Sequence, residues 1–206
     1  IYINGDLIIE EVNQPTFFGF ENIENINGNL IFKNNSISKL KAFRNLYEIQ
    51  NRLIIDANNR LISSPIDPET FVRNITVTSN DSIRFLYFGD GEINQNRLKS
   101  IEISGNQSLE SIDGMFSEQM DSIKISNNYN LNAVNAIAYT DTVYNILEIT
   151  DNPKLSECCS MEPMLNGLSD TSSTVININN NADSCNSVES ILNNCQIFTS
   201  YNTDQY

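Results

Sequence analysis

A short phrase of apolar and polar residues recurs along the whole chain. Its centre is a triplet such as LIF at 30–32 or IEI at 101–103, and the second apolar residue of each triplet serves as an anchor. The successive anchors are 23, 23, 22, 26, 22, 24 and 29 residues apart. They are Ile9, Phe32, Ile55, Val77, Ile103, Ile125, Ile149 and Ile178. This period predicts a solenoid in which each coil adds one strand to a continuous parallel sheet.

The alternation within each triplet predicts which side chains are buried. We expect the anchor and the residue two places before it, such as Ile101 and Ile103, to point inward and to stack on the same pair of the next coil at about 4.8 Å. The anchors predict a mainly β fold of about eight coils with short helical segments. A chain of 206 residues, 40% hydrophobic, is long enough for one domain with a core. We place the solenoid at 1–195, and a tail or linker at 196–206.

An asparagine follows the anchor by three residues in every repeat except the first, where Val12 stands instead. We expect the chain to leave the sheet at this point, because asparagine tolerates left-handed geometry and its side chain bonds to nearby backbone. A repeated residue serves every coil alike, so a structural ladder is favoured over a ligand role. The predicted ladder consists of Asn35, Asn58, Asn80, Asn106, Asn128, Asn152 and Asn181.

All four cysteines, Cys158, Cys159, Cys185 and Cys195, lie in the last quarter of the chain. The even number predicts two disulfides and an oxidising compartment. Adjacent cysteines are poorly placed to chelate one metal ion, and a bond between them is the most strained pairing. Cys158 and Cys159 are therefore expected to pair separately with Cys185 and Cys195, in either of two arrangements. We predict a disulfide-stapled cap at about 155–195.

The segment between the last two cysteines predicts a helix that covers the final coil. Asn186 is a candidate N-cap and Glu189 stands at the position of a capping box. Val188, Ile191 and Leu192 would form its apolar face. Such a cap protects the open end of a solenoid from edge-to-edge association.

Residues 17–61 resemble the receptor L domain, the leucine-rich-repeat-like unit of insulin and epidermal growth factor receptor ectodomains. The matching features are Gly28 before the strand at 30–32 and apolar residues at Ile23, Ile26, Leu40, Phe43, Leu46 and Ile49. The later coils and the C-terminal cysteine segment resemble bacterial secreted and surface proteins with the same array. The resemblance implies a right-handed parallel β-helix and an extracellular or cell-surface location. It does not identify a ligand, because a fold does not determine a function.

Charge and composition argue against several classes of function. Twelve Lys and Arg stand against 26 Asp and Glu, so the net charge of −14 opposes binding to nucleic acid and to anionic membranes. The chain has no histidine and therefore lacks the commonest general base and metal ligand. No apolar run has the length of a membrane span. The chain begins at Ile1 without a signal peptide, and we expect it to be a trimmed part of a secreted protein.

The sequence offers two weaker hypotheses for chemistry. Glu102 and Glu148 could serve as the acid and nucleophile of a glycosidase, although solvated acids are ordinary on so acidic a surface. Calcium could bind at two acidic or amide-rich segments, although their spacing lacks the pattern of a calcium loop. These segments are Asn177, Asn179, Asn181 and Asp183, and the turn Asp90-Gly91-Glu92. We expect no catalytic residue, no metal and no cofactor.

The residue just before each anchor should face away from the core. In the first three repeats it is Ile8, Ile31 and Ile54, whereas the later repeats have polar or charged residues. Such an apolar stripe indicates either a contact surface or a surface covered by another part of the chain. We take these three residues as a candidate interface, with a weak homodimer as one outcome. The run Phe85 to Phe88 is a second candidate, for which core packing is favoured.

The sequence therefore predicts a non-catalytic extracellular or cell-surface module for binding and adhesion. Its partner would be a protein or a polysaccharide, since solenoids bind along extended surfaces. The alternative is a structural spacer rod within a larger surface protein. A glycoside hydrolase is the third and least favoured interpretation.

Overall fold

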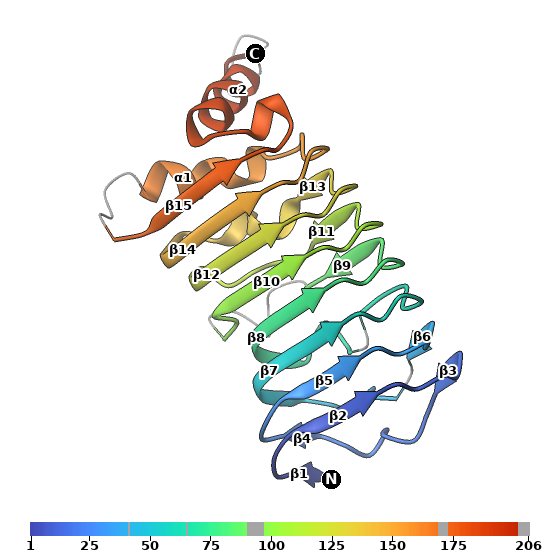
Figure 1. Ribbon diagram of the computed structural model, residues 1–206. Coiled ribbons are helices and arrows are strands. Elements are labelled where there is room, and N and C mark those ends of the chain that lie inside the picture. Colours follow the sequence, from blue (N-terminus) through green and yellow to red (C-terminus); the bar gives the residue numbers. More distant parts are fainter. Residues whose placement is uncertain (41, 65, 90–96, 169–172, 202–206) are drawn as a thin grey trace.

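The chain forms a parallel β-solenoid with one long sheet along its side (Figure 1). The computed structural model describes residues 1–40, 42–64, 66–89, 97–168 and 173–201. The long sheet contains β2 (Leu7–Glu10), β5 (Leu30–Lys33), β7 (Glu48–Asp56), β8 (Phe71–Thr78), β10 (Ser100–Ser104), β12 (Gln119–Ser126), β14 (Thr142–Thr150) and β15 (Val175–Asn179). Each of these strands pairs in parallel with the next. The short strands β1 (Tyr2–Ile3) and β4 (Asn25–Ile26) extend the sheet beside β7.

The opposite side of the solenoid is less regular. It carries the three-stranded sheet of β9 (Phe85–Tyr87), β11 (Ser111–Asp113) and β13 (Ala133–Val134), and the pair β3 (Thr16–Phe17) and β6 (Lys39–Leu40). The helical segments are η1 (Asn135–Tyr139), η2 (Cys159–Met161), α1 (Glu162–Leu168), η3 (Asp183–Cys185) and α2 (Val188–Tyr201). The mainly β solenoid with few helices is confirmed. The count of eight coils stays a prediction, because the second side does not repeat uniformly.

The anchors of the repeat all lie in register across the long sheet. Ile9 pairs with Phe32, Phe32 with Ile55, and the same position continues to Ile178. Every anchor is buried. The residues two places before the anchor are also buried from Leu30 to Leu147, whereas Ile176 on the last strand is 39% exposed. The predicted burial of these pairs is therefore confirmed along the sheet. Ile176 is more exposed because β15 is the last strand of the sheet.

The seven repeated asparagines form a continuous hydrogen-bonded ladder inside the turns. Asn106 shows the pattern: its Nδ2 donates to the anchor carbonyl of Val77 at 2.9 Å, and its Oδ1 accepts from the backbone N–H of Asn80 at 3.1 Å. Its own backbone N–H donates to Oδ1 of Asn128 at 3.1 Å. The same contacts recur from Asn35 to Asn181. All seven residues are buried, so each side chain satisfies backbone groups that water does not reach.

The left-handed turn lies one residue earlier than the sequence indicated. The residue before each ladder asparagine has a positive φ, and so does Glu11 before Val12 in the first repeat. The φ lies between 53° and 57° at the seven non-glycine positions and is 67° at Gly105. These residues are Glu11, Asn34, Ala57, Ser79, Gly105, Asn127, Asp151 and Asn180. The expectation that the ladder asparagines take this conformation is therefore wrong. They are selected for their side-chain amide, and the neighbouring residue makes the turn.

The C-terminal cap is held by two disulfides. They join Cys158 to Cys185 and Cys159 to Cys195, with Cα–Cα distances of 5.9 and 5.3 Å. The tertiary structure thus selects one of the two arrangements that the sequence left open. Helix α2 packs against α1, η2 and η3, and its own residue Ile191 is fully buried in this contact. The helix runs to Tyr201, beyond the boundary at 195, and the division between solenoid and tail stays a prediction.

The predicted N-cap of this helix is wrong by one residue. Ser187 Oγ accepts a hydrogen bond from the backbone N–H of Ser190 at 3.0 Å, so Ser187 caps α2. Asn186 has a different role, because its Oδ1 accepts from the backbone N–H of Asn181 at 3.1 Å. Asn186 therefore closes the asparagine ladder, giving its last member the acceptor that a further coil would otherwise supply.

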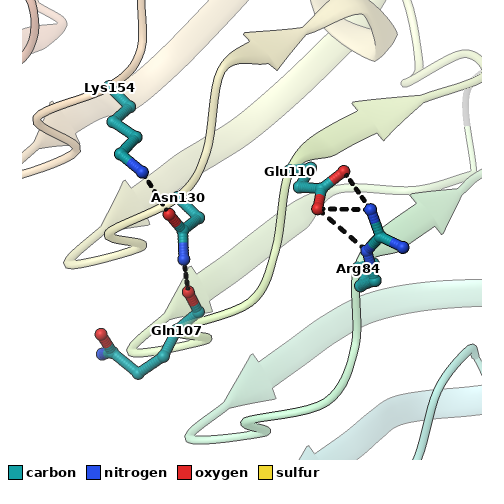
Figure 2. A network of polar contacts seen from close by, with 5 residues as sticks. All are labelled: Arg84, Gln107, Glu110, Asn130 and Lys154. Carbon is teal, nitrogen blue, oxygen red and sulfur yellow. Dashed lines mark hydrogen bonds and ion pairs between the residues drawn. The ribbon is translucent and has the colours of Figure 1, made fainter.

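A second set of polar contacts between coils lies on the surface (Figure 2). Lys154 Nζ donates to Asn130 Oδ1 at 2.6 Å, and Asn130 Nδ2 donates to the carbonyl of Gln107 at 2.6 Å. Nearby, the guanidinium of Arg84 makes a two-pronged contact with the carboxylate of Glu110. These side chains are exposed to solvent, so their contacts compete with water and contribute little to stability.

Replacing a buried ladder residue should destabilise the fold far more than replacing a surface asparagine. For Asn106→Ala we expect a loss of about 1–3 kcal/mol in the free energy of unfolding, because buried backbone groups lose their partners. Asn130→Ala is the matched control, with an expected change within about 0.5 kcal/mol. Urea denaturation of both variants measures the difference. Equal effects would contradict a structural role for the ladder.

Replacing Ala57 with a residue that tolerates a positive φ should stabilise the turn at this position. Alanine is strained at its φ of 54°, whereas asparagine occupies the equivalent position at residues 34, 127 and 180. We expect Ala57→Asn to raise the free energy of unfolding by up to about 1 kcal/mol, and Asn127→Ala to lower it by a similar amount. Thermal melts of the two variants check the prediction, and a melting temperature lowered by Ala57→Asn would contradict it.

Candidate binding surfaces

The outer face of the long sheet carries the predicted isoleucine column. Ile8, Ile31 and Ile54 lie directly beside one another on β2, β5 and β7. Ile8 is 57% exposed, and Ile31 and Ile54 are half-buried. Burial of the residues on either side of them turns the three side chains outward, as the alternation of a strand requires. The structure thus places the three residues together on one accessible face.

Polar residues flank the isoleucine column on both sides. The residues after the anchors are Glu10, Lys33 and Asp56, which are themselves in register and alternate in charge. On the other side, Arg52 Nη1 donates to Thr76 Oγ1 at 2.9 Å. An apolar centre within a polar rim is the usual composition of a protein-binding surface. The column has this composition, which a uniformly polar spacer would lack.

Farther along the same face, the column becomes polar and charged. Thr76, Glu102, Lys124 and Glu148 follow Ile54 in register. Lys124 lies between Glu102 and Glu148, so the two glutamates are on strands two positions apart on an open sheet face. Two strand spacings place their backbones roughly 9–10 Å apart. The structure therefore brings a cation between the two carboxylates that the sequence offered as a glycosidase pair.

The amide-rich segment at the last strand is engaged within the protein. Asn181 Oδ1 accepts from Asn152, and Asn177 and Asn179 contact each other. In the ranges that the structure describes, no cluster of three or more Asp, Glu, Cys or His side chains could hold a metal ion. The turn Asp90-Gly91-Glu92 lies outside the described residues.

The aromatic run on β9 and beyond divides between core and surface. Leu86 is buried, and the half-buried ring of Phe88 meets Phe116 edge to face with centroids 5.1 Å apart. Phe85 and Tyr87 are 52% and 45% exposed on the other face of the strand. Core packing thus accounts for Leu86 and Phe88, whereas Phe85 and Tyr87 lie on the surface.

A hollow beside β7 and β8 escaped the sequence analysis. It has a volume of about 420 Å³ and is lined by Glu48, Gln50, Phe71, Arg73, Arg97 and Lys99, among others. It lies where β7 and β8 change register, with two residues of β7 opposite Arg73. Such bulges redirect side chains and often adjoin functional sites. A signal was present in the sequence, because Arg73 and Lys99 each stand four residues before an anchor.

A family model of the receptor L domain matches residues 2–120, which is more than half of the chain. The chain belongs to the receptor L domain family. No curated protein and no solved structure gives a significant match. Beyond residue 120 the parallel sheet continues, and β12, β14 and β15 keep the same anchor register. The predicted family is thus confirmed.

Family membership bears on the class of function. The receptor L domain is a non-enzymatic module that binds ligands in extracellular proteins, and the two disulfides fit an extracellular location. None of the helices in the described ranges is both long and apolar enough to cross a membrane. The isoleucine column and the hollow beside β7 and β8 are therefore candidate ligand-binding sites of this L domain.

Proposed function

We propose that this L domain is a non-catalytic binding and adhesion module, secreted or held at the cell surface, that recognises a protein or a polysaccharide through its solenoid surface. The isoleucine column is the observation that carries the proposal. Solenoids present extended surfaces whose outward positions vary without disturbing the core. Here one outward column across three neighbouring strands is apolar, although the chain as a whole is strongly acidic.

The isoleucine column is suited to a protein partner, and a second copy of this chain is the simplest one to test. Glu10, Lys33 and Asp56 form a rim of alternating charge. Two such rims facing each other in opposite directions about a twofold axis can place Lys33 of one copy near a carboxylate of the other. The net charge of −14 on each chain opposes association, so the dimer is expected to be weak and favoured by salt.

Replacing Ile31 with lysine should abolish association through the column and leave the fold intact. Ile31 is the central member, and a lysine there would bring an unpaired charge into the apolar contact. Light scattering coupled to size exclusion, at concentrations of tens of micromolar, measures the mass of each variant. Asn177→Lys, at the same register position on β15 and therefore at the far end of the sheet, is the matched control and should keep the wild-type mass.

Thermal melts establish that both variants are folded. A wild-type dimer that is lost in folded Ile31→Lys but kept in Asn177→Lys supports the column as an interface. Monomeric wild-type protein at every concentration and salt would contradict self-association. A dimer that survives Ile31→Lys would show that the contact lies elsewhere on the domain.

A further inference from the structure

The hollow between β7 and β8 gathers positive charge on a strongly acidic protein. Arg73, Arg97 and Lys99 all line it, although the chain has only 12 Lys and Arg against 26 Asp and Glu. Arg97 is already engaged: its Nη1 lies 3.5 Å from Glu48 Oε1, and its guanidinium lies 4.2 Å from the centroid of the Phe71 ring. The charge of Arg97 is therefore partly balanced by Glu48 at the edge of the hollow.

The other two cations, Arg73 and Lys99, lie side by side and form no ion pair in the described ranges. Asp121 stands on the far side of Lys99, where its backbone N–H donates to the Lys99 carbonyl at 2.6 Å. The backbone N–H of Lys99 donates to the carbonyl of Arg73 at 2.7 Å, so the two residues are neighbours on adjacent coils. Within the described part of the chain, neither side chain takes part in an ion pair or a hydrogen bond. Like charges placed opposite each other on paired strands destabilise the sheet. A bound anion would relieve this repulsion and would accept hydrogen bonds from both groups.

The remaining lining residues restrict the kind of anion. Glu48 and Gln50 border the same hollow and can accept hydrogen bonds from hydroxyl groups. The Glu48 carboxylate also disfavours ligands of high negative charge density, as does the net charge of −14. The planar guanidinium of Arg73 matches a carboxylate, which it can hold through two parallel hydrogen bonds. The lining therefore suits a ligand with one carboxylate among several hydroxyls.

We propose that this hollow binds a uronic acid unit of an acidic polysaccharide, with Arg73 and Lys99 holding its carboxylate and Glu48 and Gln50 accepting from its hydroxyls. The volume of about 420 Å³ lies within the range of small-ligand pockets, roughly 300–1,000 Å³. The proposal rests on the proposed function in that the domain recognises extracellular ligands. It uses different residues from the isoleucine column and names the polysaccharide class.

Calorimetric titration with an oligosaccharide that carries one galacturonic acid among neutral sugars, at two salt concentrations, tests the proposal. We expect saturable binding by the wild type and no binding of the methyl-esterified oligomer, which has the same sugar without the charge. Arg73→Gln combined with Lys99→Gln should weaken binding about tenfold or more, because two charge-assisted contacts are lost. The matched control, Lys124→Gln combined with Lys154→Gln, removes the same charge outside the hollow and should change affinity less than about twofold.

Three outcomes would overturn the uronate site. They are the absence of wild-type binding, an equal loss in both double variants, and tighter binding of dextran sulfate that the hollow variant leaves unchanged. The last two would show attraction to general charge instead of a built site. Melting temperatures confirm that each variant is folded. Failure here leaves the isoleucine column untouched, because that surface is tested by other residues and by molecular mass.

Discussion

The hydrogen bonds of the buried asparagine ladder are the constraint on which the rest of this solenoid depends. Each coil must leave the sheet, and its turn exposes backbone donors and acceptors to an interior without water. The side chain of Asn106, like its equivalents, donates to the anchor carbonyl of the preceding coil and accepts from the backbone N–H of the ladder asparagine of that same coil. An unsatisfied buried polar group costs more than an ordinary hydrogen bond contributes. The ladder therefore fixes the stacking distance and the register of all the strands together.

A fixed register leaves the outward positions free to differ from coil to coil. The inward columns are uniformly apolar, while the column that begins with Ile8 passes from isoleucine through threonine to alternating charges. Of the two register shifts in the described part of the long sheet, the one beside Arg73 adjoins the cationic hollow. Recognition in this L domain thus resides on the outward side chains and the bulge, on a scaffold that the ladder and the disulfide cap hold together.

Much of this architecture could be predicted from spacing alone, because a strand alternates with a period of two and a coil repeats with its own length. The anchors, the outward isoleucines and the ladder asparagines all follow from counting along the chain. Counting could not show that Asn186 closes the ladder while Ser187 caps the helix. Both residues favour caps, and only the position of Asn181 in space decides which side chain reaches which donor. Similarly, the positive φ at Ala57 reflects the path of the backbone and not the preference of its side chain.

The sequence by itself determined the repeat, the buried columns and the disulfide-rich end, since each depends on local periodicity or on composition. Tertiary structure alone decided that Cys158 pairs with Cys185 and Cys159 with Cys195, because either arrangement satisfies the same spacing. It also decided that Arg73, Lys99 and Arg97 share one hollow with Glu48. These residues come from three successive coils and meet only because the coils stack in register and β7 bulges between them. Which side chains of different coils become neighbours depends on how the coils stack, and the sequence of a single repeat does not determine it.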